Sequence, residues 1–136
     1  MRDIAYIALG SNLGDREEHL QFARAAIAAL PDTKVIATST VEETDPIGPP
    51  GQGPYLNQMV AVETMLAPHA LLAALQAIEA DRGRIRGERW GPRTLDLDVV
   101  LLEEQRVSDA VLTVPHPQLV ARDFWQRELA QIRVSA

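Results

Sequence analysis

The chain has 136 residues, no cysteine, 46% hydrophobic residues and a formal net charge of −6. This length suits one domain with its own core, and the lack of cysteine excludes disulfides and thiolate metal sites. The acidic balance argues against non-specific nucleic-acid binding, which requires cations that neutralise many phosphates. No signal-peptide pattern and no apolar run of membrane-spanning length is present, so we expect a cytoplasmic protein with neither nucleic-acid nor membrane partners.

The first third of the sequence predicts a strand followed by a helix. Ile4–Leu9 is an apolar run typical of a buried strand, and the glycine-containing residues 10–14 are expected to end it. Asp15 is a candidate N-cap, because Glu18 follows three residues later as in a capping box. Apolar residues then recur at helical spacing until Pro31 ends the helix.

The middle of the sequence predicts two further strands and a second helix. Val35–Val41 is rich in valine and threonine, and Leu56–Thr64 is the next strand candidate. Between them, residues 45–54 contain four prolines and three glycines, which predicts a long loop. Pro68 suits the first turn of a helix. The apolar face of that helix is formed by Leu71, Leu72, Leu75 and Ile78.

The last third predicts a strand at Leu95–Leu102, a short strand at Val111–Val114 and a helix over Gln118–Leu129. The resulting order, β-α-β-β-α-β, is that of a ferredoxin-like α+β fold, in which an antiparallel sheet carries helices on one face. No internal repeat or linker is visible, so we expect residues 1–136 to form a single domain.

Arginines are concentrated between Asp81 and Arg93, where five arginines and two acidic residues give a local net charge of +3. The planar guanidinium group suits bidentate binding of phosphate oxygens. The alternative is a solvated helix end whose cations are favoured by the helix dipole.

Asp96 and Asp98 are two residues apart in a predicted strand, so their side chains point to the same face. Neighbouring carboxylates repel each other unless a cation intervenes, and Mg²⁺ is commonly held by one or two carboxylates plus substrate phosphates. The alternative is an exposed strand face with two solvated acids. Trp90 and Arg93 closely precede the pair, and the combination indicates a phosphoryl-transfer site.

The segment Arg89–Leu102, RWGPRTLDLDVVLL, resembles the signature of the 6-hydroxymethyl-7,8-dihydropterin pyrophosphokinase family of the folate pathway. Further family-like motifs occur in the same order: YIALGSNLGD at Tyr6–Asp15, TDPIGP at Thr44–Pro49, YLN at Tyr55–Asn57, GRIR at Gly83–Arg86 and LTVPHP at Leu112–Pro117. The resemblance covers residues 4–124. It implies a three-layer α/β/α sandwich on a ferredoxin-like core, and transfer of pyrophosphate from ATP to the pterin hydroxymethyl group with release of AMP.

By this resemblance, Asp96 and Asp98 hold two Mg²⁺ ions and act with Arg84 and Arg93 as catalytic residues. The residues expected to contact the co-substrate ATP are Gln76, Glu79, Arg84, Arg86, Arg89, Trp90, Arg93, His116 and Arg122. The residues expected to contact the pterin are Thr44, Pro46, Ile47, Gly48, Tyr55, Asn57 and Phe124. Two of these, Tyr55 and Phe124, would sandwich the ring while amide and hydroxyl groups read its edge.

The sequence leaves other interpretations open. Tyr55 could be a core residue, and Glu79 could pair with an arginine of its own helix. A non-catalytic binding module could keep the pocket without turnover, and a metal-dependent phosphohydrolase could use the same two aspartates. The residues after Phe124 follow the family pattern loosely and stop early, which predicts a pyrophosphokinase domain with a shortened C-terminus. Because apolar surface would then be exposed or covered by another subunit, we expect a monomer with a dimer as the alternative.

Overall fold

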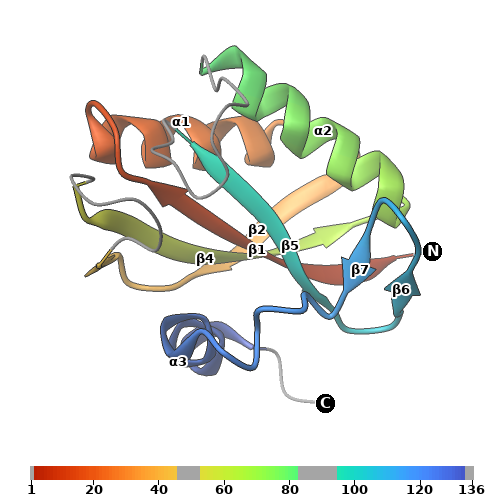
Figure 1. Cartoon of the computed structure of the whole chain (residues 1–136). Helices are drawn as coiled ribbons and strands as arrows, with labels where there is room; N and C mark the ends of the chain where they lie inside the picture. Colours follow the sequence, from red (N-terminus) through yellow and green to blue (C-terminus); the bar gives the residue numbers. More distant parts are fainter. Residues whose placement is uncertain (1, 46–52, 83–94, 134–136) are drawn as a thin grey trace.

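The computed structural model describes residues 2–45, 53–82 and 95–133 (Figure 1). In chain order the elements are β1 (Asp3–Ser11), α1 (Arg16–Ala28), β2 (Thr33–Thr38), β3 (Glu42–Thr44), β4 (Tyr55–Thr64), α2 (Pro68–Asp81), β5 (Asp96–Leu102), β6 (Val107–Ser108), β7 (Thr113–Val114) and α3 (Asp123–Ile132). Within these residues, no helix combines the length and the apolar character needed to cross a bilayer.

The central sheet is antiparallel, and its strands run in the order β2-β4-β1-β5, with β3 also paired to β4. β1 lies in the middle because it pairs with β4 along its full length, from Asp3 opposite Thr64 to Ser11 opposite Leu56, and with β5 on its other side. This strand order, with two helices on one face, confirms the predicted ferredoxin-like α+β fold. A separate two-stranded sheet joins β6 to β7.

The sheet lies between two helical layers, with α1 and α2 on one face and α3 on the other (Figure 1). The first face buries a core that includes Ile7, Leu9, Leu20, Ile27, Leu71 and Leu75. The second face buries a smaller core that includes Tyr6, Ala8, Met59, Trp125, Leu129 and Ile132. Alternate residues of β1 therefore enter opposite cores, as the period of a strand requires. The three-layer arrangement implied by the resemblance is confirmed.

The first two helices begin where the sequence predicts. Asp15 is the N-cap of α1, because its Oδ1 atom accepts the N–H of Glu18 at 3.1 Å. Pro68 occupies the first turn of α2, where its missing N–H removes no intrahelical hydrogen bond. Both helices bury the predicted apolar stripe against the sheet.

β1 is longer than its apolar run predicts. The sequence places its end after Leu9, whereas the strand continues through Gly10 to Ser11. Pairing on both sides extends it, since Gly10 lies opposite Asn57 of β4 and opposite Asp96 of β5. A glycine inside a strand often marks a place where another group approaches the backbone closely.

The strand predicted at Val35–Val41 is observed as β2, which begins at Thr33 and ends at Thr38. β2 ends at Thr38 because the Oγ atom of Ser39, in place of a backbone carbonyl, accepts the N–H of Met59 at 2.9 Å. After this interruption the chain forms β3, whose three residues carry too short a pattern to be predicted from the sequence.

The C-terminal elements also differ from the prediction. The sequence predicts a helix from Gln118, whereas α3 begins at Asp123. His116 accounts for the difference, because its Nδ1 atom accepts the N–H of Gln118 and its carbonyl oxygen accepts the N–H of Leu119, both at 3.0 Å. Turns therefore replace the first part of the predicted helix. The strand predicted at Val111–Val114 is reduced to β7.

β5 contains a β-bulge. Its register against β1 shifts by one residue between Val99 and Leu101, so that Val100 is an extra residue. Val100 and Leu101 therefore both enter the core on the α3 face, and Leu102 returns to the core under α1 and α2. The bulge changes which residues of β5 face each layer.

Candidate active site

A cavity of about 640 Å³ lies where β1, β4 and β5 meet, and it reaches residues of α2 and α3. Among the residues that line it are the ten predicted site residues that the structure describes: Thr44, Tyr55, Asn57, Gln76, Glu79, Asp96, Asp98, His116, Arg122 and Phe124. The fold thus brings together positions that are far apart in the chain.

The other eight predicted residues fall outside the described part of the chain. They are Pro46, Ile47 and Gly48 of the proline-rich segment, and Arg84, Arg86, Arg89, Trp90 and Arg93 of the arginine-rich segment. Their roles stay predictions.

The floor of the cavity is a row of residues on neighbouring strands. Asp96 of β5 lies opposite Gly10 of β1, and Gly10 lies opposite Asn57 of β4, so all three positions share the face of the sheet that α3 covers. A Cβ atom at Gly10 would lie 3.4 Å from Cδ1 of Tyr55 and 3.5 Å from Oδ1 of Asn57. The missing side chain therefore leaves space between these groups. Sequence reasoning did not assign Gly10 to the site; a glycine directly after an apolar run was its only signal.

Asp96 and Asp98 both line the cavity and share one face of β5, as predicted. Within the described ranges, no three His, Cys, Asp or Glu side chains are grouped so that they could hold a metal ion. The two aspartates can therefore supply only part of a coordination shell. This donor set fits Mg²⁺, which takes one or two carboxylates and completes its octahedron with water and substrate phosphate oxygens.

Glu79 of α2 contacts β5 between the two aspartates and is only 3% exposed. Its Oε2 atom accepts the N–H of Leu97, the residue between them, at 2.8 Å. The resemblance implies a position near the nucleotide, and Glu79 does line the cavity. The bond to β5 was not predicted, because it joins two elements whose packing the sequence does not specify.

His116 presents one ring nitrogen to the cavity. Its Nε2 atom lies 3.8 Å from Oδ1 of Asp98, whereas its Nδ1 atom accepts the N–H of Gln118. Burial, and then the charge of Arg122, lower the pKa of His116, and Asp96 opposes this shift. The imidazole is therefore neutral at neutral pH, and because Nδ1 is an acceptor, its proton lies on Nε2. Nε2–H is a hydrogen-bond donor directed to the side where Asp98 lies.

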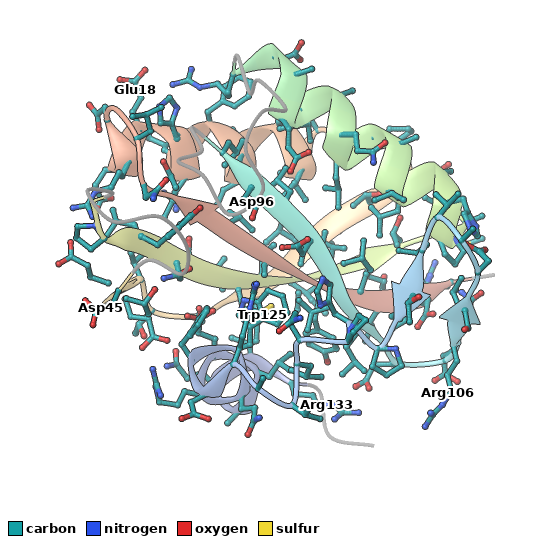
Figure 2. The ribbon with its side chains drawn as sticks, in the orientation of Figure 1. Glu18, Asp45, Asp96, Arg106, Trp125 and Arg133 are labelled. Carbon is teal, nitrogen blue, oxygen red and sulfur yellow. The ribbon has the colours of Figure 1, made fainter. Side chains whose placement is uncertain are left out.

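Trp125 supports this side of the cavity from between α3 and the sheet (Figure 2). Its ring meets that of His116 edge to face, with centroids 4.9 Å apart, and the guanidinium group of Arg122 lies 4.4 Å from its centroid. Sequence reasoning did not place Trp125 in the site.

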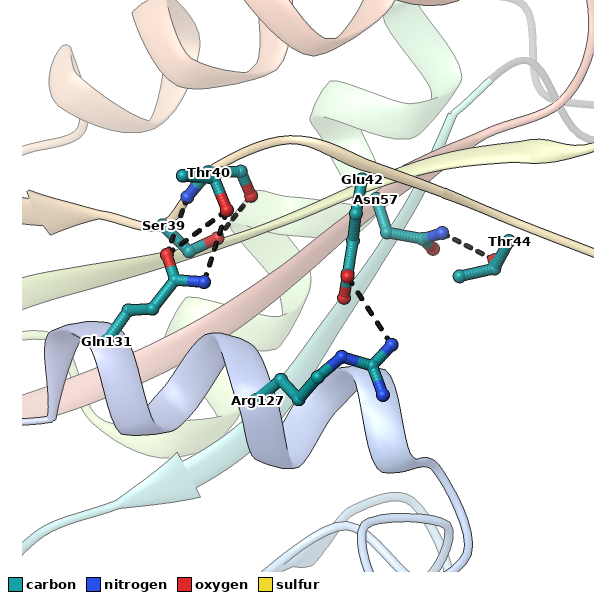
Figure 3. A network of polar contacts seen from close by, with 7 residues as sticks. All are labelled: Ser39, Thr40, Glu42, Thr44, Asn57, Arg127 and Gln131. Atoms are coloured by element: carbon teal, nitrogen blue, oxygen red, sulfur yellow. Dashed lines mark hydrogen bonds and ion pairs between the residues drawn. The ribbon is translucent and has the colours of Figure 1, made fainter.

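Another part of the cavity wall combines aromatic and amide groups. The Nδ2 atom of Asn57 donates to Oγ1 of Thr44 at 2.6 Å, which fixes the orientation of the amide (Figure 3). Tyr55 comes from β4 and Phe124 from α3, and both rings line the cavity. Two aromatic faces beside an oriented amide suit a flat, polar heterocycle.

The sequence is similar to a known protein family and to curated members of it. The model of 7,8-dihydro-6-hydroxymethylpterin-pyrophosphokinase (HPPK) matches residues 6–134. The 2-amino-4-hydroxy-6-hydroxymethyldihydropteridine pyrophosphokinase of Pseudomonas aeruginosa is 47% identical over 127 residues, which are 93% of this chain and 78% of that protein. The protein of the same name from Bacillus subtilis is 45% identical over 132 residues, or 97% of this chain and 79% of that protein.

A solved structure supports the same fold. The crystal structure of an HPPK-DHPS protein in complex with substrates has a TM-score of 0.70, with 97% of this chain and 40% of that chain covered. At 14% identity this likeness shows the fold alone. The family model, in contrast, spans nearly the whole sequence, and the two relatives are 47% and 45% identical to the chain over the aligned residues. The chain belongs to the 7,8-dihydro-6-hydroxymethylpterin-pyrophosphokinase family.

Proposed function

We propose that the chain transfers a pyrophosphoryl group from ATP to the hydroxymethyl group of 6-hydroxymethyl-7,8-dihydropterin, a step of folate biosynthesis. The hydroxyl oxygen bonds to the β-phosphorus, the bond from the β-phosphorus to the oxygen it shares with the α-phosphorus breaks, and AMP leaves. The hydroxyl proton is released. Family membership supports this reaction, and one observation carries it here: a single cavity joins two aromatic rings and an amide to a pair of carboxylates.

Asp96 and Asp98 are the proposed ligands of two Mg²⁺ ions. When bound, magnesium neutralises phosphate charge and makes the substrate hydroxyl a better nucleophile. The contribution of the chain is to position the two carboxylates, which share a strand face and whose intervening backbone is held by Glu79. Asp96 and Asp98 would thus bring the triphosphate to the floor of the cavity.

The part of the cavity formed by His116 and Arg122, which precede α3, is the proposed phosphate side. His116 offers a neutral Nε2–H donor, and Arg122 offers a guanidinium whose Nε atom is buried without a hydrogen-bond partner among the described residues. Phosphate oxygens could accept both. Gln76 and Glu79 would lie at the nucleotide. Four arginines of the arginine-rich segment are proposed to complete the charge neutralisation: Arg84, Arg86, Arg89 and Arg93. Trp90 of the same segment is proposed to contact the ATP beside them.

The pterin is proposed to lie between Tyr55 and Phe124. Asn57 and Thr44 would read the polar edge of its ring, helped by the segment Pro46–Gly48. The open space at Gly10 lies beside both Tyr55 and Asn57, and would admit the ring close to the strand backbone.

Two other functions make different predictions in one assay. The protein is incubated with Mg-ATP, with and without the hydroxymethylpterin, and AMP and inorganic phosphate are measured. Pterin-dependent AMP release is expected. Phosphate release without pterin would favour a phosphohydrolase, and pterin binding without any product would favour a non-catalytic binding module. The monomeric state stays a prediction, which sedimentation analysis of the purified protein would test.

A further inference from the structure

Two glutamates outside the proposed substrate contacts face each other in the interior. Glu128 of α3 is 0% exposed. Among the residues that the structure describes, neither of its carboxyl oxygens has a hydrogen-bond donor if Glu128 and its neighbour Glu42 are both ionised. The Oε1 atom of Glu42 in β3 is likewise buried without a donor. Buried carboxyl oxygens without donors are strongly unfavourable, so this arrangement requires an explanation.

A proton on Glu128 explains the arrangement. Burial, and then the hydrogen bond and charge of Glu42, raise the pKa of Glu128 to about 9, while Arg127 opposes the shift. At neutral pH Glu128 is then a carboxylic acid that donates to Glu42. The other oxygen of Glu42, Oε2, is 3.4 Å from the guanidinium of Arg127, so Glu42 has a partner for its charge.

The pair lies between two elements of the cavity wall. Glu42 is opposite Asn57 in the sheet and two residues before Thr44, whereas Glu128 is one turn after Phe124 in α3. Figure 3 shows Glu42 and Arg127 at this contact. A second link to α3 lies close by in the chain, since the amide side chain of Gln131 bonds to Thr40, two residues before β3 begins.

We propose that Glu42 and Glu128 are positioning residues: they share one proton, and the resulting hydrogen bond holds β3 against α3. Because β3 carries Thr44 and α3 carries Phe124, the pair would set the width of the pterin pocket. This role rests on the proposed function, whereas the shared proton does not. Loss of the proton would place two like charges in the interior and separate the two elements.

The pH dependence has a definite sign. The pKa of Glu128 is raised in the folded state, from 4.5 to about 9, so the folded protein binds more protons than the unfolded chain between these values. The contribution of this group to stability is therefore fully present below 4.5 and is lost as the pH rises toward about 9. Replacement of Glu128 by Gln removes this loss, because a Gln amide can donate to Glu42 at every pH.

The proton is tested without any assay of turnover. In protein labelled with ¹³C at the glutamate carboxyl carbon, we expect one carboxyl signal to titrate near pH 9 and to be missing in Glu128→Gln. Glu42→Gln should move this titration to lower pH, because it removes a like charge. Glu17, an exposed residue of α1, provides the control. The variant Glu17→Gln should keep the high-pH signal. Titration of every glutamate in its ordinary range would overturn the proposal.

The positioning role is tested by kinetics from about pH 7 to about pH 10. For the parent, the KM for the pterin is expected to rise about tenfold, the effect of one hydrogen bond, while the KM for ATP changes little. Glu128→Gln should bind the pterin equally well at both ends of this range. If the pterin KM rises equally with pH in the parent and in Glu128→Gln, the positioning role is wrong, even if the shared proton is found.

A bound cation is the competing explanation of the pair. If Mg²⁺ without nucleotide stabilises the parent against heat and fails to stabilise Glu128→Gln, then an ion bridges the carboxylates and the shared proton is wrong. If neither Glu128→Gln nor Glu42→Gln folds, the parent titration alone decides. An inactive parent that still shows the high-pH signal would contradict the proposed function and leave the proton intact.

Discussion

The carboxylate of Glu79 in α2 accepts the backbone N–H of Leu97 in β5 at 2.8 Å, and thereby holds the strand between Asp96 and Asp98. Its removal would leave a buried backbone donor without a partner and loosen both aspartates. We expect Glu79→Ala to lower the free energy of unfolding by about 2–4 kcal/mol, measured by urea denaturation.

The same variant should need more magnesium. If Glu79 positions the aspartates, the Mg²⁺ concentration for half-maximal activity rises in Glu79→Ala and rises less in Glu79→Gln, which keeps an acceptor oxygen. An unchanged magnesium requirement in a folded Glu79→Ala protein would restrict this residue to a structural role.

Asp98→Asn separates catalysis from folding. The aspartates are neighbours on one strand face, so removal of one charge should leave the stability of the metal-free protein within about 0.5 kcal/mol of the parent. AMP release should fall by at least about 10²-fold, because the metal site loses a ligand. The two measurements are a thermal melt without Mg²⁺ and the AMP assay; near-normal turnover would contradict the metal assignment.

Gly10→Ala is expected to fold well and to bind the pterin poorly. The new Cβ would lie 3.4 Å from the Tyr55 ring and 3.5 Å from Asn57, an ordinary contact that occupies the floor of the pocket. We expect a rise of about tenfold in the KM for the pterin, with a smaller change for ATP. Gly53→Ala is the matched control, because its Cβ would meet only a backbone oxygen at 3.8 Å. Equal pterin KM values in the two variants would show that Gly10 is unrelated to the site.

The two phenylalanines of the chain allow a paired test of stacking. Phe124→Ala should weaken pterin binding by about 1–3 kcal/mol, the range for a stacked aromatic base. Phe22, which packs on the opposite face of the sheet and under Arg82, is the control. Phe22→Ala should lower the melting temperature and leave the pterin affinity of the folded protein unchanged. Isothermal titration with the pterin measures both, and equal affinity losses would argue against a sandwich that includes Phe124.

His116 makes stability depend on pH on the acid side. Burial and Arg122 lower its pKa from 6.5, so the unfolded chain takes up a proton first as the pH falls. The stability that the neutral ring contributes is present above 6.5 and is lost with acidification. His116→Gln should flatten this part of the profile of unfolding free energy against pH. Ring-nitrogen NMR follows the titration directly, and a midpoint at or above the ordinary histidine value would contradict the assignment.

The sequence predicts the main elements because their patterns are long. β1, β4, β5, α1 and α2 each carry five or more residues of a clear apolar pattern, and the two helices have start signals in the N-cap Asp15 and the first-turn Pro68. The failures are short or depend on side chains from elsewhere. β3 exists because β4 offers it a partner, and α3 begins late because His116 binds the backbone after it.

The features of the site also divide into those that a local sequence pattern predicts and those that depend on distant residues. Period-two spacing predicts that Asp96 and Asp98 share a face, and the structure shows this. In contrast, Gly10 matters to the site because Tyr55 of the neighbouring strand lies against it. Glu128 is perturbed because Glu42 of β3 lies beside it. Such relationships need the register and the packing of the elements, neither of which a single sequence provides.

The bulge at Val100 restricts how the length of β5 can change. Upstream of it, the two aspartates share a face with the cavity, and downstream of it Leu102 belongs to the opposite core. A single inserted or deleted residue between Asp98 and the bulge would turn the acids toward α1 and α2, because a slip of one residue inverts every side chain. Relatives that keep the chemistry should therefore vary in length outside this segment, in the loops at either end of β5.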